Sequence, residues 1–166
     1  LGTPNPYQHG VVWDIAANPT ISLATKTTQG AVAATGAFTS NITGLTPGTL
    51  YHVRAYATNT TGTAYGSDVS FAVTSTTVGT SGSPSVYGST VTFTAAVLPA
   101  TATGTVTFYD GATVLGTGTL SAGTAVYSTS ALNVSGSPHN ITASFAGSGI
   151  YGSSTSLAIS QAIIPA

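Results

Sequence analysis

The sequence predicts an all-β protein made of two β-sandwiches in tandem, the first of them incomplete. Three observations predict this class. Short runs rich in Val, Tyr, Phe and Thr alternate between apolar and polar residues, as strands with one buried face do. Gly and Pro, with 20 and 8 copies, separate these runs as turn residues. No stretch places apolar residues convincingly at helical spacing, and 166 residues suffice for two small domains.

The clearest strand follows a turn at Pro47-Gly48. Its alternation puts one set of side chains in a core and the other in water. We expect the inward set to be Tyr51, Val53, Ala55 and Ala57, and the outward set to be His52, Arg54 and Tyr56.

Weaker strands surround it in the first half of the chain, between turn signals such as Asn18-Pro19. Each has apolar residues at alternate positions or is rich in β-branched residues. We expect a strand from Gly10 with Val11, Trp13 and Ile15 inward, a weak edge strand at 21–28, a strand at 36–45 with Phe38, Ser40 and Ile42 on one face, and a last strand with Val69, Phe71 and Val73.

The pattern Leu-x-Pro-x-Thr-x-Tyr-x-Val-x-Ala at 45–55 resembles the E–F corner of the fibronectin type III fold. Together with the run GVVWDI and the other strands expected in the first half of the chain, this pattern extends the resemblance over residues 1–73. It implies that Tyr51 is a corner tyrosine, with its ring buried and its hydroxyl bonded to nearby backbone. Family members carry two strands, A and B, before the Trp strand, whereas this chain has only a short segment there.

The resemblance therefore implies that the strand at 36–45 lacks its sheet partners. An apolar sheet face with no opposing layer is not stable in water, and an unpaired edge recruits strands. We expect the missing strands from one of two sources: the native chain continues before Leu1, or another copy supplies them. In the second case each subunit completes the next, which builds a filament.

The second half repeats the strand-and-turn rhythm with a different pattern. Residues 74–80 form either a hinge or an opening strand, and Asp110-Gly111 is a strong hairpin signal. Val91, Phe93, Ala95 and Val97 are expected inward on one strand, Val106 and Phe108 follow on the next, and His139, Ile141, Ala143 and Phe145 are expected together on one face. Further strands are expected at Val114-Leu115 and 125–130, with Leu157, Ile159 and Gln161 at alternate positions near the end.

The runs SVYGSTVTFTAAV, GTVTFYDG and HNITASFAGSGIYGSSTS resemble a bacterial immunoglobulin-like repeat domain over residues 75–163. Ser148 departs from the family, which often has Asp at this position of its loop. The two resemblances together imply two immunoglobulin-like sandwiches, with domains at 1–74 and 75–166. Since the two halves are distinct types, we see no internal repeat.

Charged residues make up only 3% of the chain. Lys26 and Arg54 cannot form the basic patch that nucleic-acid binding requires. A near-neutral surface favours self-association, which suits an extracellular domain packed against other copies or other domains of a surface protein. There is no Cys, hence no disulfide or thiolate site, and no twenty-residue apolar span, so we expect no membrane insertion.

The residue types argue against catalysis, a cofactor or a metal site. The chain has no Glu, and His9, His52 and His139 fall in different strands and domains, so we expect scattered surface or rim histidines. Asp110 is expected to serve its turn. No Gly-x-Ser-x-Gly elbow occurs. A pocket that brings His52, an Asp and a Ser within hydrogen-bond distance would overturn the expectation of no enzyme.

The aromatic residues divide into a core set and a candidate surface set. The expected structural anchors are Trp13, Tyr51, Phe71, Phe93, Phe108 and Phe145. Tyr56, Tyr65, Tyr87 and Tyr109 are either exposed residues that stack on sugars or a partner, or cross-strand pairs within a sheet. The candidate glycosylation sequons begin at Asn41, Asn59, Asn133 and Asn140.

The sequence thus predicts a non-catalytic structural module of an extracellular surface protein, adhesin or fibre. Two alternatives remain open. One is a homopolymeric filament subunit completed by strands of a neighbouring copy. The other is a carbohydrate-binding accessory module, which requires an exposed row of tyrosines on one sheet.

Overall fold

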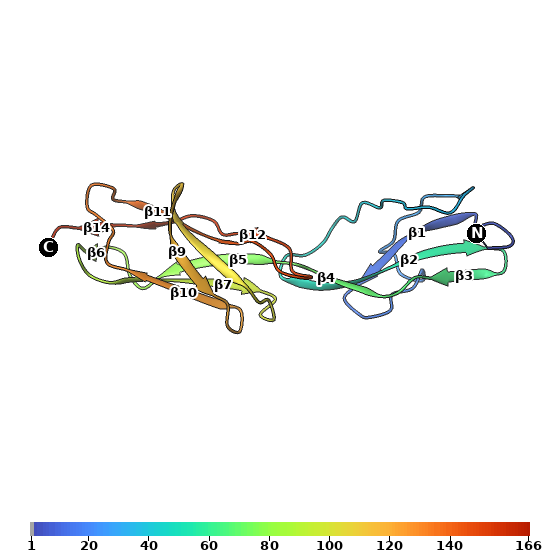
Figure 1. Ribbon diagram of the computed structural model, residues 1–166, viewed down its shortest axis with the longest axis horizontal. Helices are drawn as coiled ribbons and strands as arrows, with labels where there is room; N and C mark the ends of the chain where they lie inside the picture. Colours follow the sequence, from blue (N-terminus) through green and yellow to red (C-terminus); the bar gives the residue numbers. More distant parts are fainter. Residues whose placement is uncertain (1) are drawn as a thin grey trace. The chain divides into compact units, whose positions relative to one another are not determined.

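The computed structural model describes residues 2–166 (Figure 1). Every regular element among these residues is a β-strand, which confirms the predicted all-β fold class. The chain forms two compact units, Leu1–Ala72 and Val73–Ala166, called unit 1 and unit 2 below. The sequence placed the domain boundary after residue 74, and the structure places it after Ala72.

The described part of unit 1 is one antiparallel sheet around a long central strand. The central strand carries a neighbour along each edge, in the order β1-β2-β3, and β4 also pairs with it. Its strands are β1 (Gln8–Asp14), β2 (Thr49–Asn59), β3 (Gly62–Tyr65) and β4 (Val69–Val73).

The predicted edge strand at 21–28 is wrong as a regular strand, although its backbone does follow the free edge of β1. The Trp13 amide donates to the Thr25 carbonyl at 3.0 Å, and the Thr27 amide donates to the Val11 carbonyl at 2.8 Å. Among the described residues, this segment forms a single isolated bridge with β1, between Lys26 and Val12.

The predicted strand at 36–45 is also wrong, because the structure shows an irregular segment there. Phe38, expected to share one strand face with Ser40 and Ile42, is 42% exposed. A strand persists when a neighbour accepts its backbone hydrogen bonds, and the described residues of unit 1 provide no second sheet for this segment to join.

The sheet of unit 1 buries side chains on both faces, and the sequence predicted only one. Trp13 and Tyr51, on the face expected to be inward, are buried, whereas Ile15 of the same set is 67% exposed. Val12 and Tyr56 lie on the opposite face and are buried as well. The outward assignment of Tyr56 is therefore wrong.

The cause lies in the chain segment that covers this opposite face. The Tyr56 hydroxyl donates to the Thr27 carbonyl oxygen at 2.6 Å. Gly10, paired with Tyr56 in the sheet, leaves room for the same oxygen, which would lie 2.2 Å from a Cβ at that position. A glycine in β1 thus lets an irregular segment pack directly on the sheet.

Unit 2 has the two layers of a β-sandwich. One sheet has the order β10-β7-β5, and the other has the order β12-β11-β8-β9, with β13 also paired to β11; β14 and β6 form a small parallel pair (Figure 1). The strands are β5 (Ser75–Thr80), β6 (Ser85–Val86), β7 (Val91–Leu98), β8 (Thr105–Asp110), β9 (Thr113–Thr119), β10 (Thr124–Thr129), β11 (His139–Phe145), β12 (Ser154–Thr155), β13 (Ile159–Gln161) and β14 (Ile163–Ile164).

The strands predicted for this half are confirmed in their main features. Alternate residues of β7, β8 and β11 point into one core, with Phe93 and Phe108 fully buried. The opening-strand alternative for residues 74–80 is correct, since β5 pairs with β7. Asp110-Gly111 begins the β8–β9 turn, and Gly111 has a φ of 55°. Leu157 was expected to lie on the same strand face as Ile159 and Gln161, but its side chain is 91% exposed.

No helix among the described residues has the length and apolar character to span a bilayer.

Candidate functional site

Buried His139 and partly exposed Asp110 form a pair at one end of the second sheet of unit 2. The imidazole Nδ1 lies 2.6 Å from Asp110 Oδ2, and Nε2 lies 2.9 Å from the Asn133 carbonyl oxygen. His139 is 4% exposed. The second carboxylate oxygen of Asp110 accepts the Asn140 amide at 3.1 Å. Both nitrogens of the ring therefore have a partner, and the ring has no free nitrogen with which to act on a ligand.

The expectation of scattered surface histidines is wrong for His139, and Asp110 does more than shape its turn. The two residues are 29 positions apart and meet because β11 pairs with β8. A signal was present in the sequence, since His139 is in phase with the inward residues Ile141, Ala143 and Phe145. A buried imidazole needs polar partners, and Asp110 is one.

A second group, in unit 1, brings together a His, an Asp and a Ser. His52 Nδ1 lies 3.1 Å from Asp68 Oδ2 and 3.4 Å from the Ser70 hydroxyl. The Asn18 amide donates to the same carboxylate oxygen of Asp68 at 2.8 Å. The expectation of scattered histidines did not include this carboxylate partner of His52.

The geometry of this group differs from that of a hydrolytic triad. In a triad one imidazole nitrogen faces the carboxylate and the other faces the hydroxyl, so that a proton can pass through the ring. Here Asp68 and Ser70 both face Nδ1 of His52. The carboxylate and the hydroxyl compete for a single nitrogen. None of the three residues lines the groove on the unit 1 sheet that is described below.

His9, the third histidine, belongs to the wall of a groove. Its Nδ1 lies 2.8 Å from the Gly30 carbonyl oxygen, and its ring packs edge-on against Phe38 with 5.1 Å between centroids. Within residues 2–166, no group of three or more His, Asp or Glu side chains has a metal-binding arrangement. The described part of the chain thus gathers no set of metal ligands.

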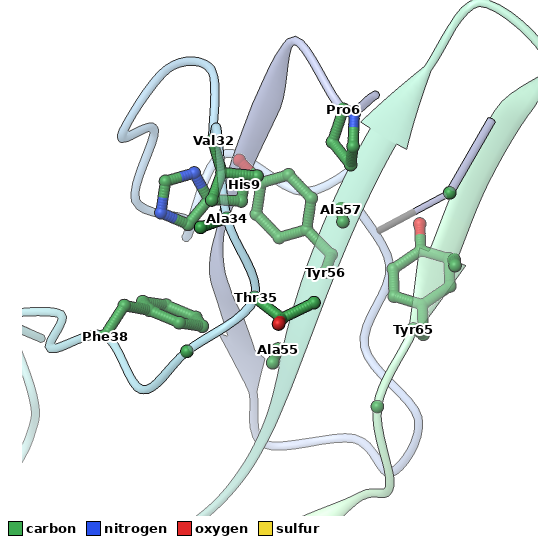
Figure 2. Close-up of a pocket in the computed structure, with 14 residues that line it drawn as sticks. Pro6, His9, Val32, Ala34, Thr35, Phe38, Ala55, Tyr56, Ala57 and Tyr65 are labelled. Atoms are coloured by element: carbon green, nitrogen blue, oxygen red, sulfur yellow. The ribbon is translucent and has the colours of Figure 1, made fainter. Parts of the chain in front are cut away.

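The groove itself has a volume of about 440 Å³ and lies on one face of the unit 1 sheet (Figure 2). Ala55, Ala57 and Ala64 contribute small side chains on β2 and β3, while Val32 and Phe38 come from the irregular segment. Its lining is mostly apolar. The groove could hold a flat apolar group or an extended chain, and it has no charged side chain to orient either.

The four tyrosines considered for sugar stacking do not form a row. Tyr56 is buried and bonded to backbone, and the Tyr65 hydroxyl accepts the Ile21 amide at 2.9 Å. The Arg54 guanidinium lies 4.6 Å from the centroid of the Tyr65 ring. Tyr87, in unit 2, is 54% exposed, and Tyr109 is half-buried.

Five of the six aromatic residues expected as structural anchors are buried, and the sixth is half-buried. The Thr46 amide donates to the Tyr51 hydroxyl at 3.0 Å, and the Tyr51 ring stacks on Phe71. Trp13, Tyr51, Phe93, Phe108 and Phe145 are buried, and Phe71 is half-buried. Of the sequon asparagines, Asn41, Asn133 and Asn140 are exposed and Asn59 is half-buried.

The sequence reasoning missed a set of buried polar side chains in unit 2. Thr74, Thr76 and Gln161 are 6%, 7% and 0% exposed. A weak signal existed for Gln161, which shares the phase of Ile159 in the predicted last strand. The two threonines gave no signal in a chain so rich in this residue.

Comparisons with known proteins assign a family to the second half of the chain. Residues 75–164 match the family model of a bacterial Ig-like domain (group 3). No curated protein matches the chain.

Three solved structures illustrate what the whole chain is similar to. The fibronectin(III)-like modules of Clostridium thermocellum CbhA share 13% identity at a TM-score of 0.36, with 99% of this chain and 81% of that chain covered. The I-band fragment I67-I69 of titin shares 13% identity at a TM-score of 0.41, with 95% and 56% covered. The full ectodomain of mouse nectin-like molecule 4 shares 14% identity at a TM-score of 0.37, with 70% and 41% covered. Because the family model matches more than half of its residues, the chain belongs to the bacterial Ig-like domain (group 3) family.

Proposed function

We propose that this chain is a non-catalytic structural segment of an extracellular surface protein of the adhesin or fibre type. The observation that carries the proposal is the bacterial Ig-like domain at residues 75–164, a domain type common in bacterial surface proteins. Domains of this kind are generally non-catalytic and act as spacers between other parts of a protein.

The two histidine–aspartate pairs support the non-catalytic part of the proposal. His139 has both nitrogens engaged, by Asp110 and by the Asn133 carbonyl. The Asp68 carboxylate and the Ser70 hydroxyl both lie within hydrogen-bond distance of Nδ1 of His52. In a hydrolytic triad the carboxylate and the nucleophilic hydroxyl face different imidazole nitrogens, and neither histidine has that arrangement. These pairs instead satisfy polar groups within the fold.

The low charge supports a packed, extracellular setting. With 3% charged residues, electrostatic repulsion between copies is weak, so the chain is suited to packing against other copies or other domains of the same protein. Ser and Thr hydroxyls supply the polar surface in place of charged groups.

The proposal is tested in the organism that encodes the chain. Antibodies against unit 2 should label intact cells, and brief protease treatment of those cells should remove the signal. Labelling that requires cell lysis would contradict the surface assignment. For the non-catalytic part, the purified chain is assayed with ester, peptide and glycoside substrates. A turnover that His52→Ala abolishes would contradict it.

The filament alternative draws on the groove of unit 1. An apolar lining that includes Ala55, Ala57 and Ala64 lies open on a sheet with no opposing layer among the described residues. Strands from another copy would supply the layer that packs on such a face. In this alternative, sedimentation of the purified chain shows assembly that grows with concentration and negative-stain images show fibres, whereas a spacer stays monomeric.

A further inference from the structure

The loop between β10 and β11, residues 130–138, holds the sequence Asn133-Val134-Ser135 in a fixed turn. Asn133 is exposed, although Leu132 before it is buried. The side-chain oxygen of Asn133, Oδ1, accepts the Ser135 hydroxyl at 2.8 Å and the Gly136 amide at 2.7 Å. No protein atom of residues 2–166 accepts a hydrogen bond from its side-chain nitrogen, Nδ2. This nitrogen is therefore open to solvent and to other molecules.

The loop is anchored near both of its ends. His139 Nε2 donates to the backbone carbonyl of Asn133 at 2.9 Å, and Asp110 holds the other nitrogen of the ring. Further along, the Ile163 amide donates to the Ser137 hydroxyl at 2.8 Å. The histidine–aspartate pair thus acts as a positioning pair, which fixes the backbone from which the Asn133 side chain projects.

The two donors on Oδ1 of Asn133 change the chemistry of its amide group. An amide nitrogen is a weak nucleophile, because its lone pair is delocalised into the carbonyl group. It becomes reactive as its proton leaves, and negative charge then gathers on the amide oxygen. Donors to that oxygen stabilise the charge, as they do in an oxyanion hole. Ser135 and Gly136 supply two such donors, so the turn prepares Nδ2 to form a bond with an electrophilic carbon.

A similar turn occurs at Asn59 in unit 1, with one important difference. Oδ1 of Asn59 accepts the Thr61 hydroxyl at 2.6 Å and the Gly62 amide at 3.1 Å. Its Nδ2, however, donates to the Pro4 carbonyl oxygen at 2.9 Å, and the residue is half-buried. Asn59 can react only after this bond breaks. The chain therefore carries two comparable turns, one with an open nitrogen and one with a closed nitrogen.

The other two Asn-x-Thr sequences each lack one of these conditions. Asn140 lies in β11, which pairs with β8 and β13. Its backbone amide donates to Asp110 and its carbonyl accepts the Gly111 amide, so an enzyme that bound this sequence would have to pull a strand out of the sheet. Asn41 is exposed on the irregular segment of unit 1, but the chain forms no turn there.

We propose that Asn133 of the folded chain is the preferred acceptor for an N-linked sugar, supplied by a nucleotide-activated hexose through a transferase. Nδ2 forms a bond with the anomeric carbon, and the bond from that carbon to the phosphate oxygen breaks. The nucleoside diphosphate leaves with the electron pair, and a base of the transferase takes the proton that Nδ2 loses. The fold closes Asn59 to the same reaction. The proposal goes beyond the structural role and remains in place if the surface-labelling test fails.

The test compares each acceptor in the folded chain with the same sequence in a short synthetic peptide. The purified full chain and peptides spanning 37–46, 55–65, 129–138 and 136–145 are incubated with a soluble N-glycosyltransferase and a nucleotide-activated hexose. Proteolysis and mass spectrometry then give the initial rate of hexose addition at each asparagine. The rate in the chain divided by the rate in the peptide removes the sequence preference of the enzyme.

We expect this ratio to exceed one at Asn133, by about threefold, because the free peptide occupies the prepared turn for only a fraction of the time. At Asn59 the ratio should fall to about one tenth or less, as the breaking of one ordinary hydrogen bond implies. It should stay close to one at Asn41, and Asn140 should gain no hexose. A ratio of one or less at Asn133, or one that does not exceed the ratio at Asn59, would overturn the proposal.

Two variants separate the effect of the turn from that of simple exposure. Ser135→Thr keeps a hydroxyl on Oδ1 of Asn133 and should leave the ratio unchanged. His139→Gln removes the ring that holds the Asn133 backbone, so the ratio should fall to about one. The ratio at Asn41 in the same molecule is the internal control, since a change in enzyme or donor would alter both sites.

Circular dichroism shows whether unit 2 of the His139→Gln chain is folded. If it is not, Asp110→Asn is subject to the same comparison, because it leaves the histidine in place and removes the charge of its partner. A folded variant that keeps the full ratio at Asn133 would overturn the assignment of His139 and Asp110 as a positioning pair.

Discussion

Asp110 Oδ2 lies 2.6 Å from Nδ1 of His139, across two paired strands of unit 2. The histidine is 4% exposed and the aspartate side chain 27% exposed, so the pair links the core to the surface. The ring is buried at low cost only because both of its nitrogens have partners. Removal of either partner leaves a buried polar atom without a hydrogen bond.

Asp110→Ala should therefore destabilise unit 2 by about 1–3 kcal/mol, the usual cost of leaving a buried polar group unsatisfied. The substitution also removes the acceptor for the Asn140 amide. Urea unfolding followed by circular dichroism measures the change. Asp110→Asn keeps an acceptor oxygen and should lose less. A chain with Asp110→Ala that unfolds at the same urea concentration as the unmodified protein would show that the pair contributes nothing.

The fold of unit 2 was predictable because its sheets bury one face each. Residues such as Phe93 and Val97 keep the period of two that a half-buried strand imposes. In unit 1 the sheet buries side chains on both faces, and an irregular segment packs on one of them. Tyr56 is buried by the Thr27 carbonyl, 29 positions away, and no local pattern announces such a contact.

The polar pairs were not predictable for a related reason. His139 meets Asp110, and His52 meets Asp68, through strand pairing, and the register of two strands depends on packing over the whole sheet. The period of two groups His139 with Ile141 and Phe145, but no local pattern indicates its partner. Thr74 was equally hidden, since threonine is common on strands whether exposed or buried.

Gly10→Ala should destabilise unit 1, because the added Cβ would lie 2.2 Å from the Thr27 carbonyl oxygen. The covering segment must then move away from β1, and overpacking of this kind typically costs about 1–3 kcal/mol. Gly36→Ala is the matched control, since nothing lies within 4 Å of a Cβ there. Urea unfolding should show a lower midpoint for the first variant and an unchanged or slightly higher one for the second. The reverse order would mean that the segment does not pack on the sheet.

Tyr51→Phe and Tyr56→Phe should each cost about 1 kcal/mol in unit 1. Both hydroxyls are bonded to backbone, to the Thr46 amide and the Thr27 carbonyl respectively, and both rings are buried. Tyr7→Phe, at a residue 57% exposed, serves as the control and should change the unfolding free energy by less than about 0.5 kcal/mol. If the three variants unfold alike, the two hydrogen bonds do not stabilise the unit.

The last prediction is that unit 1 unfolds before unit 2. The core of unit 2 combines residues such as Phe93, Phe108 and Phe145, all at most 1% exposed, between two sheets. The described part of unit 1 has one sheet, and its largest buried side chains, Trp13, Tyr51 and Tyr56, keep 9%, 8% and 4% of their surface exposed. Less apolar surface leaves the solvent there, so less free energy opposes unfolding.

Trp13 allows the two units to be followed separately, because it is the only tryptophan in the chain. Its fluorescence reports on unit 1, whereas far-ultraviolet circular dichroism reports on the strands of both units. In a urea titration the fluorescence change should be complete while part of the circular dichroism signal remains. Trp13→Ala, which removes a large buried side chain, should lower the first transition by about 3–5 kcal/mol and leave the second in place. Coincident transitions by both probes would mean that the two units unfold as one cooperative body and would contradict the prediction.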